Sequence, residues 1–196
     1  MKIYIKASVN TSPTDIAKTI QRWSERLSKD PVGNQNCMLC TWAAEQRFRG
    51  IDVLPRAVYS PRDPIFNINP RQIVAGAISI PNLTVDKLKA ALDRSGSGCR
   101  YYVHVNWAGS SGGHEFLTLN NGGKFYVLDA QSGIYAPIDS PEGREYFDDI
   151  NPKNSYAFRI DNKPLNEEYL KLNDDKHLVD WDEDADTKFM KENDML

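Results

Sequence analysis

The sequence has no long hydrophobic run, few cysteines and little net charge. No stretch of about 18 apolar residues occurs, so no helix is expected to span a bilayer. The three cysteines are an odd number, which argues against a disulfide framework. The net charge of −3 gives no basic balance for binding nucleic acid. Lys6 interrupts the N-terminal apolar run, so no secretory signal is expected. These absences predict synthesis in the cytosol, which is compatible with later delivery into another cell.

Length and composition are those of one globular domain with an acidic extension. The chain has 196 residues, of which 40% are hydrophobic and 26% charged, enough for a core without disulfides, metal or cofactor. Residues 164–196 hold eleven acidic and four basic residues, whereas residues 1–163 hold sixteen acidic and twenty basic ones. We therefore expect a domain over 1–163 and an acidic tail over 164–196. The tail is either a solvated extension or a cover over the basic body, an attraction that salt would weaken.

Local patterns predict helices first and antiparallel strands afterwards, the α+β class. Apolar residues at helical spacing, after a capping serine and a proline, predict a helix from Pro13 to Ser28. A second helix is expected from Cys37 to Gly50, with Asn36 as its N-cap, and a third over residues 84–92. Strands are expected over residues 2–6, 101–107, 114–119, 124–128 and 155–160, and irregular structure over 51–80.

Cys37 would lie in the first turn of its helix if Asn36 caps it. Unpaired backbone N–H groups and the helix dipole at that position favour a thiolate over a thiol. A cysteine nucleophile needs such an environment and a base nearby. The competing interpretation is a small buried core residue, which is the common fate of a cysteine without a disulfide.

A hairpin brings a possible base and its partner together. Asn121-Gly122 is a strong two-residue turn signal, and with these two residues as the loop, His114 lies opposite Asp129. Directly opposed side chains share one face of the sheet, about 5 Å apart at their β-carbons. An aspartate beside a histidine holds its tautomer and stabilises the imidazolium, as in a hydrolytic triad. The same register places Phe116 opposite Val127, and we expect both side chains to be buried.

Cys37 opening a helix, Gly113-His114 on one strand and an Asp129-Ala-Gln131-Ser-Gly133 turn ending the next resemble the papain-fold toxin domains of bacterial polymorphic toxins. The resemblance covers about residues 34–133. It implies a papain-like fold, with N-terminal helices and the cysteine helix packed on an antiparallel sheet. It also implies Cys37 as nucleophile, His114 as base and Asp129 as the orienting residue.

Several proteins of this group are protein-glutamine deamidases, so the resemblance implies a thiol hydrolase acting on a protein as a toxin or effector. It allows for a cognate immunity or regulatory protein as partner, and no nucleic acid or membrane is expected. The candidates for holding the oxyanion or positioning substrate are the Cys37 backbone N–H and the side chains of Gln35, Asn36 and Gln131. Papain places its oxyanion glutamine several residues before the cysteine, whereas Asn34 and Gln35 are nearer here.

Other readings remain open. A protease or a ubiquitin-like deconjugase would use the same three residues, and a papain-fold binding module would keep them without turnover. Cys37-x-x-Cys40 is half of a zinc site that Cys99 and His104 would have to complete, but no second close pair of ligands is present. Alternation places His104 on the opposite face of its strand from Val103 and Val105, in a polar or structural role. His177 lies in the acidic tail.

Overall fold

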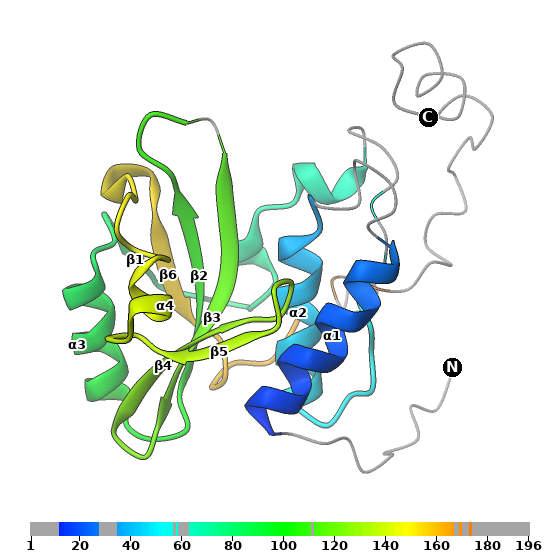
Figure 1. The fold of residues 1–196 in the computed structure, drawn as a ribbon, viewed down its shortest axis with the longest axis horizontal. Helices are drawn as coiled ribbons and strands as arrows, with labels where there is room; N and C mark the ends of the chain where they lie inside the picture. Colours follow the sequence, from blue (N-terminus) through cyan, green and yellow to red (C-terminus); the bar gives the residue numbers. More distant parts are fainter. Residues whose placement is uncertain are drawn as a thin grey trace.

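The computed structural model describes residues 12–27, 35–56, 58, 63–110, 112–166, 169 and 173. Within them the chain is an α+β structure, a six-stranded antiparallel sheet in the order β1-β6-β2-β3-β4-β5 with helices on both faces (Figure 1). The helices are α1 (Pro13–Leu27), α2 (Cys37–Phe48), α3 (Val85–Ser95) and the short α4 (Pro141–Arg144). The 3-10 turns are η2 (Pro64–Asn67), η3 (Pro70–Gln72) and η4 (Pro152–Asn154). The strands are β1 (Ser79–Pro81), β2 (Arg100–Asn106), β3 (Gly113–Asn121), β4 (Lys124–Asp129), β5 (Ile134–Pro137) and β6 (Tyr156–Arg159).

The three longer helices and the four central strands were predicted from sequence to within a few residues. The predicted strand over residues 2–6 lies outside the described residues, as does Ser28. Sequence reasoning missed the two strands at the edges of the sheet. β1 falls in the segment predicted to be irregular, and β5 follows Gly133 directly. Both are four residues or shorter, too short for a period of two to stand out.

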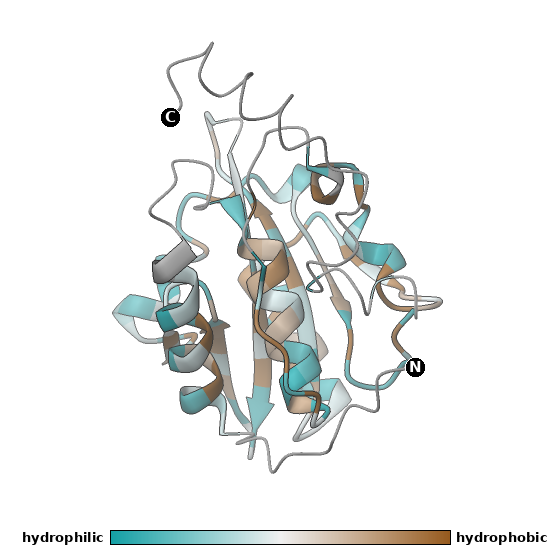
Figure 2. Ribbon diagram, turned by 90° about the vertical axis from the view of Figure 1, so that its right-hand side faces the viewer, coloured by the Kyte–Doolittle hydropathy of each residue, from teal (hydrophilic) through white to brown (hydrophobic). Residues whose placement is uncertain are grey.

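Two cores form because side chains on a strand alternate between the faces of the sheet. On β2, Tyr102 packs with α1 and α2, whereas Val103 and Val105 pack with α3. Figure 1 shows α1 and α2 to one side of the sheet and α3 to the other. Ile16 and Ile20 of α1 are fully buried, and Figure 2 shows the hydrophobic stripe and hydrophilic outer side of that helix. The sequence expectation that the cysteine helix packs on the sheet is confirmed, since α2 lies on β3.

The β3–β4 hairpin differs from its predicted register. Asn121 pairs with Lys124, so the loop consists of Gly122 and Gly123, and the prediction of an Asn121-Gly122 loop is wrong. Both glycines have positive φ, 62° and 84°, which glycine adopts without the steric cost that asparagine has at the first position. The true register therefore differs from the predicted one by two residues. A shift of two leaves every side chain on its predicted face, whereas a shift of one would have reversed them all.

With this shift Val127 pairs with Thr118, and the predicted pairing of Phe116 with Val127 is also wrong. Phe116 and Val127 are nevertheless both fully buried in the core on the α3 face. They keep that place because the two registers put the same side chains on the same side of the sheet.

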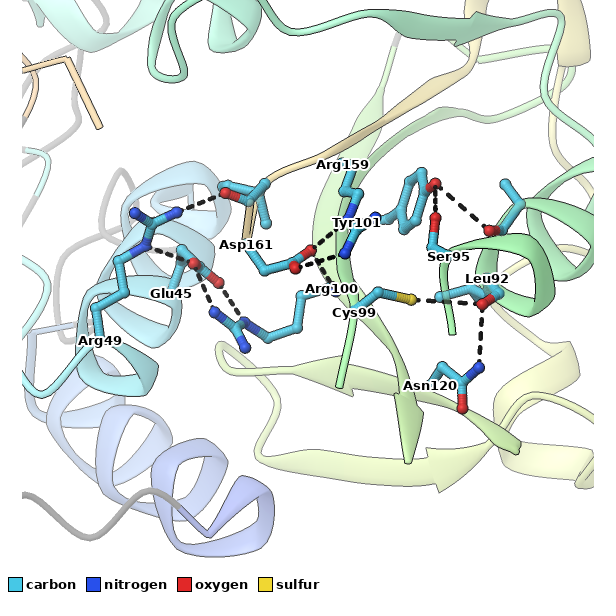
Figure 3. Close-up of polar contacts among 12 residues, drawn as sticks. Glu45, Arg49, Leu92, Ser95, Cys99, Arg100, Tyr101, Asn120, Arg159 and Asp161 are labelled. Atoms are coloured by element: carbon cyan, nitrogen blue, oxygen red, sulfur yellow. Dashed lines mark hydrogen bonds and ion pairs between the residues drawn. The ribbon is translucent and has the colours of Figure 1, made fainter. Parts of the chain in front are cut away.

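An ionic network fixes the C-terminal half of α2 to the sheet (Figure 3). The fully buried carboxylate of Glu45 accepts hydrogen bonds from Arg49 Nε at 2.7 Å and from Arg100 Nε at 2.6 Å. Asp161 extends the network, accepting from the Arg100 backbone N–H at 2.9 Å and from Arg159 at 3.0 Å. Glu45 and Cys37 belong to the same helix, so these bonds help to position the helix that begins at Cys37.

Some residues of the predicted acidic tail contact the domain. Leu165 forms an isolated bridge with Val74, and Tyr169 accepts a hydrogen bond at its carbonyl from Trp42 Nε1 at 2.8 Å. The Asn173 side chain donates to the carbonyl of Leu39 in α2 at 3.3 Å. These described residues pack on the same side of the molecule as α2, so their removal would disturb the helix that carries Cys37.

Candidate active site

Cys37 is the first residue of α2 and is half-buried. Asn36 is the N-cap residue of α2, as predicted, but its side chain makes no capping hydrogen bond. Its Oδ1 instead accepts from Gln131 Nε2 at 2.8 Å and from Ser24 Oγ at 3.3 Å. The Asn36 side chain therefore bonds to a residue distant in the sequence and not to the backbone of its own helix. The bond to Gln131 ties the turn after Asp129 to the start of the cysteine helix.

The backbone of β3 holds the start of α2 along the part of β3 that does not pair with β4. The β3–β4 ladder ends at the pair Leu117 and Leu128, so nearer its start β3 has no β4 partner. Thr41 Oγ1 of α2 donates there to the carbonyl of Glu115 at 2.8 Å. The backbone N–H of Glu115 also acts on the Cys37 sulfur as a hydrogen-bond donor. The sulfur is therefore placed against the peptide that joins His114 to Glu115.

Burial raises the pKa of the Cys37 thiol, and the negative charge of Glu115 raises it further. Backbone N–H groups of Glu115 and Met38 act in the opposite direction, but they do not compensate. The prediction that the helix start produces a thiolate is therefore wrong for the resting protein. The free energy of removing a thiolate from water exceeds what the donors at the helix terminus return. Cys37 is a neutral thiol until a base removes its proton.

The expected contact between His114 and Asp129 is present, although the register predicted for it is not. His114 Nε2 lies 2.8 Å from Asp129 Oδ2, just beyond the end of the β3–β4 ladder. The side chains are 17% and 2% exposed. The His114 ring also packs near Phe116 and Tyr146, with centroids 6.0 Å and 6.1 Å away. These neighbours limit the orientations that the ring can adopt.

Four donors surround the Asp129 carboxylate. Oδ2 accepts from His114 and from Tyr146 OH at 2.8 Å, and Oδ1 accepts from the backbone N–H groups of Gln131 at 2.9 Å and Ser132 at 3.2 Å. Burial raises the pKa of Asp129, but the hydrogen bond and charge of His114, with the bonds from Tyr146 and Ser132, outweigh it, and the net shift is downward. Asp129 is therefore an ionised acceptor at neutral pH.

Tyr146 was not identified from the sequence. It lies just after α4, 17 positions from Asp129, and no local pattern marks it. Burial and the charge of Asp129 raise the pKa of its hydroxyl, so Tyr146 remains a donor to the carboxylate. Gly133 closes the same turn with a φ of 73°, and a Cβ there would lie 2.2 Å from Gln21 Oε1. The Asp129–Gly133 turn thus rests directly on α1.

A hollow of about 310 Å³ contains both Cys37 and His114 in its wall. Its apolar wall consists of residues from the start of α2 and from the η2–η3 segment: Met38, Ile65, Phe66, Ile68 and Pro70. Its polar wall consists of residues from β2, β3 and the segment before α2: Gln35, His104, Asn106, Gly113 and Glu115. The predicted residue Gln35 therefore lines the hollow, whereas Asn36 and Gln131 are not among its lining residues and bond to each other.

A buried ion pair holds the apolar wall in place. Arg56 Nη1 and Nη2 donate to the two oxygens of Asp63 at 2.6 Å and 2.7 Å. Asp63 also accepts from the backbone N–H of Ile65 at 2.9 Å, which starts the η2 turn. Phe66 within that turn is 45% exposed, an unusual position for a large apolar side chain.

His104 lies on the opposite face from Val103 and Val105, as predicted, and it lines the hollow. Its Nδ1 lies 3.1 Å from Glu115 Oε1, and its Nε2 lies 3.2 Å from Asn106 Nδ2. Both ring nitrogens of His104 are therefore occupied. Among the described residues His114 makes one hydrogen bond through its ring, at Nε2, so its Nδ1 has no hydrogen-bond partner among them. No hydrogen bond joins Cys37 to His114 within the described part of the chain.

The other cysteines belong to the two cores. Cys40 is fully buried on the α2 face, and burial raises the pKa of its thiol to about 12. Cys99 lies in the core on the α3 face, where Sγ donates to the Leu92 carbonyl at 3.5 Å (Figure 3). The sheet separates Cys99 from Cys37 and Cys40, so the alternative zinc site does not assemble. The described residues contain no group of three potential metal ligands, and His177 lies outside them.

Helices of the length and hydrophobicity needed to cross a membrane are absent from the described residues. Comparison of the chain with protein-family models, with curated proteins and with solved structures found no match.

Proposed function

We propose that the protein is a papain-like cysteine hydrolase that cleaves amide C–N bonds with Cys37, His114 and Asp129. The observation that carries the proposal is the His114–Asp129 pair at 2.8 Å, together with the presence of His114 and Cys37 in the lining of one hollow. His104 lines the same hollow but has no unoccupied ring nitrogen, so it does not compete for the role of base.

The resting thiol determines the order of the steps. His114 Nδ1 removes the proton from Cys37 as the sulfur attacks the amide carbonyl carbon, so no stable ion pair precedes substrate. Asp129 keeps the proton of His114 on Nε2 and stabilises the imidazolium that forms. The oxyanion accepts hydrogen bonds, for which the Cys37 backbone N–H and the Gln35 side chain are the nearest candidates. His114 then protonates the leaving nitrogen, and water hydrolyses the thioester.

Within this class we favour a protein-glutamine deamidase that acts as an effector or toxin, the activity that the resemblance implies. The hollow supports this choice by its size. A volume of about 310 Å³ lies at the lower limit for small-molecule sites, which suits a single side chain better than an extended peptide. A protease or a ubiquitin-like deconjugase is the alternative, with a peptide or lysine amine as leaving group in place of ammonia.

A second candidate is a papain-fold binding module without turnover. Two observations favour it, the raised pKa of Cys37 and the absence of a Cys37–His114 hydrogen bond among the described residues. Catalytic hydrogen bonds often form only when substrate is present, so the resting geometry is compatible with both candidates.

The test measures ammonia release and peptide-bond cleavage with a panel of unfolded proteins and glutamine peptides. Cys37→Ser and His114→Ala are expected to abolish turnover, because each removes a group that touches the reacting atoms. Asp129→Asn is expected to lower turnover strongly, because it removes the carboxylate that orients His114. Asp139→Asn is its charge-matched control, since Asp139 is an exposed carboxylate whose partner in the described part of the chain is Lys89. Ammonia without cleavage indicates a deamidase, and cleavage indicates a protease. Turnover that survives Cys37→Ser would refute the hydrolase proposal.

A further inference from the structure

Glu115 lines the hollow with a buried carboxylate, and this carboxylate has no part in the mechanism proposed above. The residue is only 7% exposed, and it follows His114 directly on β3. Its side chain is held by His104 Nδ1 at 3.1 Å, while His104 is held in turn by Asn106 and stacks on Tyr156 with centroids 4.8 Å apart. Glu115 is thus part of a preformed polar wall facing the nucleophile.

The charge of this carboxylate acts on its surroundings. It is the second cause, after burial, of the raised pKa of Cys37. It is likewise the second cause, after burial, of the rise in the pKa of Tyr156 to about 12. A second anion entering the hollow would meet the same unfavourable field. A neutral group with N–H donors would instead find an acceptor there.

We propose that Glu115 determines specificity at this site by accepting an N–H of a substrate carboxamide and excluding carboxylates. The inference rests on the proposed function and names its substrate class as a side-chain carboxamide. The methylene groups of such a side chain would contact the apolar wall at Ile65, Phe66 and Ile68. The carboxamide would then lie between Cys37 and Glu115.

The same charge assists release of the product. Hydrolysis breaks the C–N bond, ammonia leaves with the proton from His114, and water supplies the oxygen that converts the amide to a carboxylate. The product side chain is therefore an anion next to Glu115, whereas the substrate was neutral. Repulsion between the two carboxylates favours departure and disfavours rebinding of product.

The test compares two alkylating reagents, one with a carboxamide and one with a carboxylate. Iodoacetamide carries a carboxamide and iodoacetate a carboxylate, and in both the thiolate sulfur displaces iodide from the methylene carbon. The ratio of their rate constants at Cys37, located by peptide mass, is divided by the ratio measured for free cysteine. We expect wild type to favour iodoacetamide by about tenfold more than free cysteine does, the effect of like charges several ångströms apart near a protein surface.

Glu115→Gln should bring this ratio close to that of free cysteine, because glutamine keeps the volume and can still accept from His104. Asp139→Asn removes an equal charge from an exposed site and should leave the ratio unchanged. A wild-type ratio equal to that of free cysteine would overturn the proposal without any variant. An undiminished ratio in folded Glu115→Gln would also overturn it.

Failure of the proposed function would look different. His114→Ala should abolish ammonia release while leaving the ratio of the two reagents intact, because the ratio depends on Glu115 and not on turnover. In a protein that releases no ammonia but shows the Glu115-dependent ratio, the hydrolase proposal fails and the recognition of carboxamides stands.

Discussion

Replacing Asp129 by asparagine tests the proposed site most directly, because the change alters hydrogen-bond polarity and very little volume. Oδ1 of Asp129 accepts from two backbone N–H groups, of Gln131 and Ser132, and an asparagine oxygen can keep both bonds. The asparagine Nδ2 then faces His114 and Tyr146. Being a donor, it forces His114 Nε2 to accept, which places the ring proton on Nδ1. The nitrogen that should accept the proton of Cys37 is then occupied.

The expected loss of activity is much larger than the loss of stability. A base held in the wrong tautomer lowers kcat by about 10⁴ in hydrolases that use this arrangement. For folding, the bonds to His114 and Tyr146 change from charge-assisted to neutral, at about 1 kcal/mol each. The free energy of unfolding should therefore fall by about 2 kcal/mol, and the variant should remain folded.

The stability difference should depend on pH in a defined direction. The folded-state pKa of Asp129 lies below its ordinary value of 3.8, so its ionised form stabilises the fold. This contribution is fully present above the unfolded pKa and is lost as pH falls through the folded value. Denaturant titrations of wild type and Asp129→Asn should diverge at neutral pH and converge as the pH falls from about 4 through the folded-state pKa.

Ammonia release gives the activity, and the ¹⁵N chemical shifts of His114 report its tautomer. If Asp129→Asn keeps activity within about tenfold of wild type while the tautomer has changed, His114 is not the base through Nδ1. If the tautomer does not change, the hydrogen-bond argument itself is wrong. Asp139→Asn, measured in parallel, shows what an equal loss of charge does elsewhere.

Three further experiments test other parts of the structure, one on the wild type and two on variants. Wild-type Cys37 should react slowly with iodoacetamide at acidic and neutral pH and faster only at alkaline pH, because burial raises the pKa of its thiol; fast labelling at about pH 5 would contradict this. Glu45→Gln should lower the free energy of unfolding by about 3 kcal/mol in denaturant titrations, whereas Asp52→Asn, which removes an exposed ion pair, should change it by under about 1 kcal/mol. Gly133→Ala should lower the melting temperature, with a loss of about 2 kcal/mol, since φ is 73° and Gln21 fills the space; an unchanged melting temperature would refute that reason.

Local sequence patterns determined most of the elements and the faces of the sheet. The apolar spacing of α1, the start of α2 and the alternation along β2 each depend on neighbours in the chain, so they can be read without the fold. The same holds for the shared face of His114 and Asp129. Side-chain parity along a strand survives an error of two residues in register, and the hairpin prediction was wrong by that amount.

Only the tertiary structure decided the contacts that join distant segments. The Asn36 side chain bonds to Gln131, 95 residues away, and makes no capping hydrogen bond to its own helix. Tyr146 and the pairing of His104 with Glu115 arise because the sheet brings their strands and helices together. The pKa of Cys37 depended on the balance between helix terminus and burial, and burial exists only in the folded protein. Spacing along the chain carries no signal for such effects, since they depend on which surfaces pack and which water is removed.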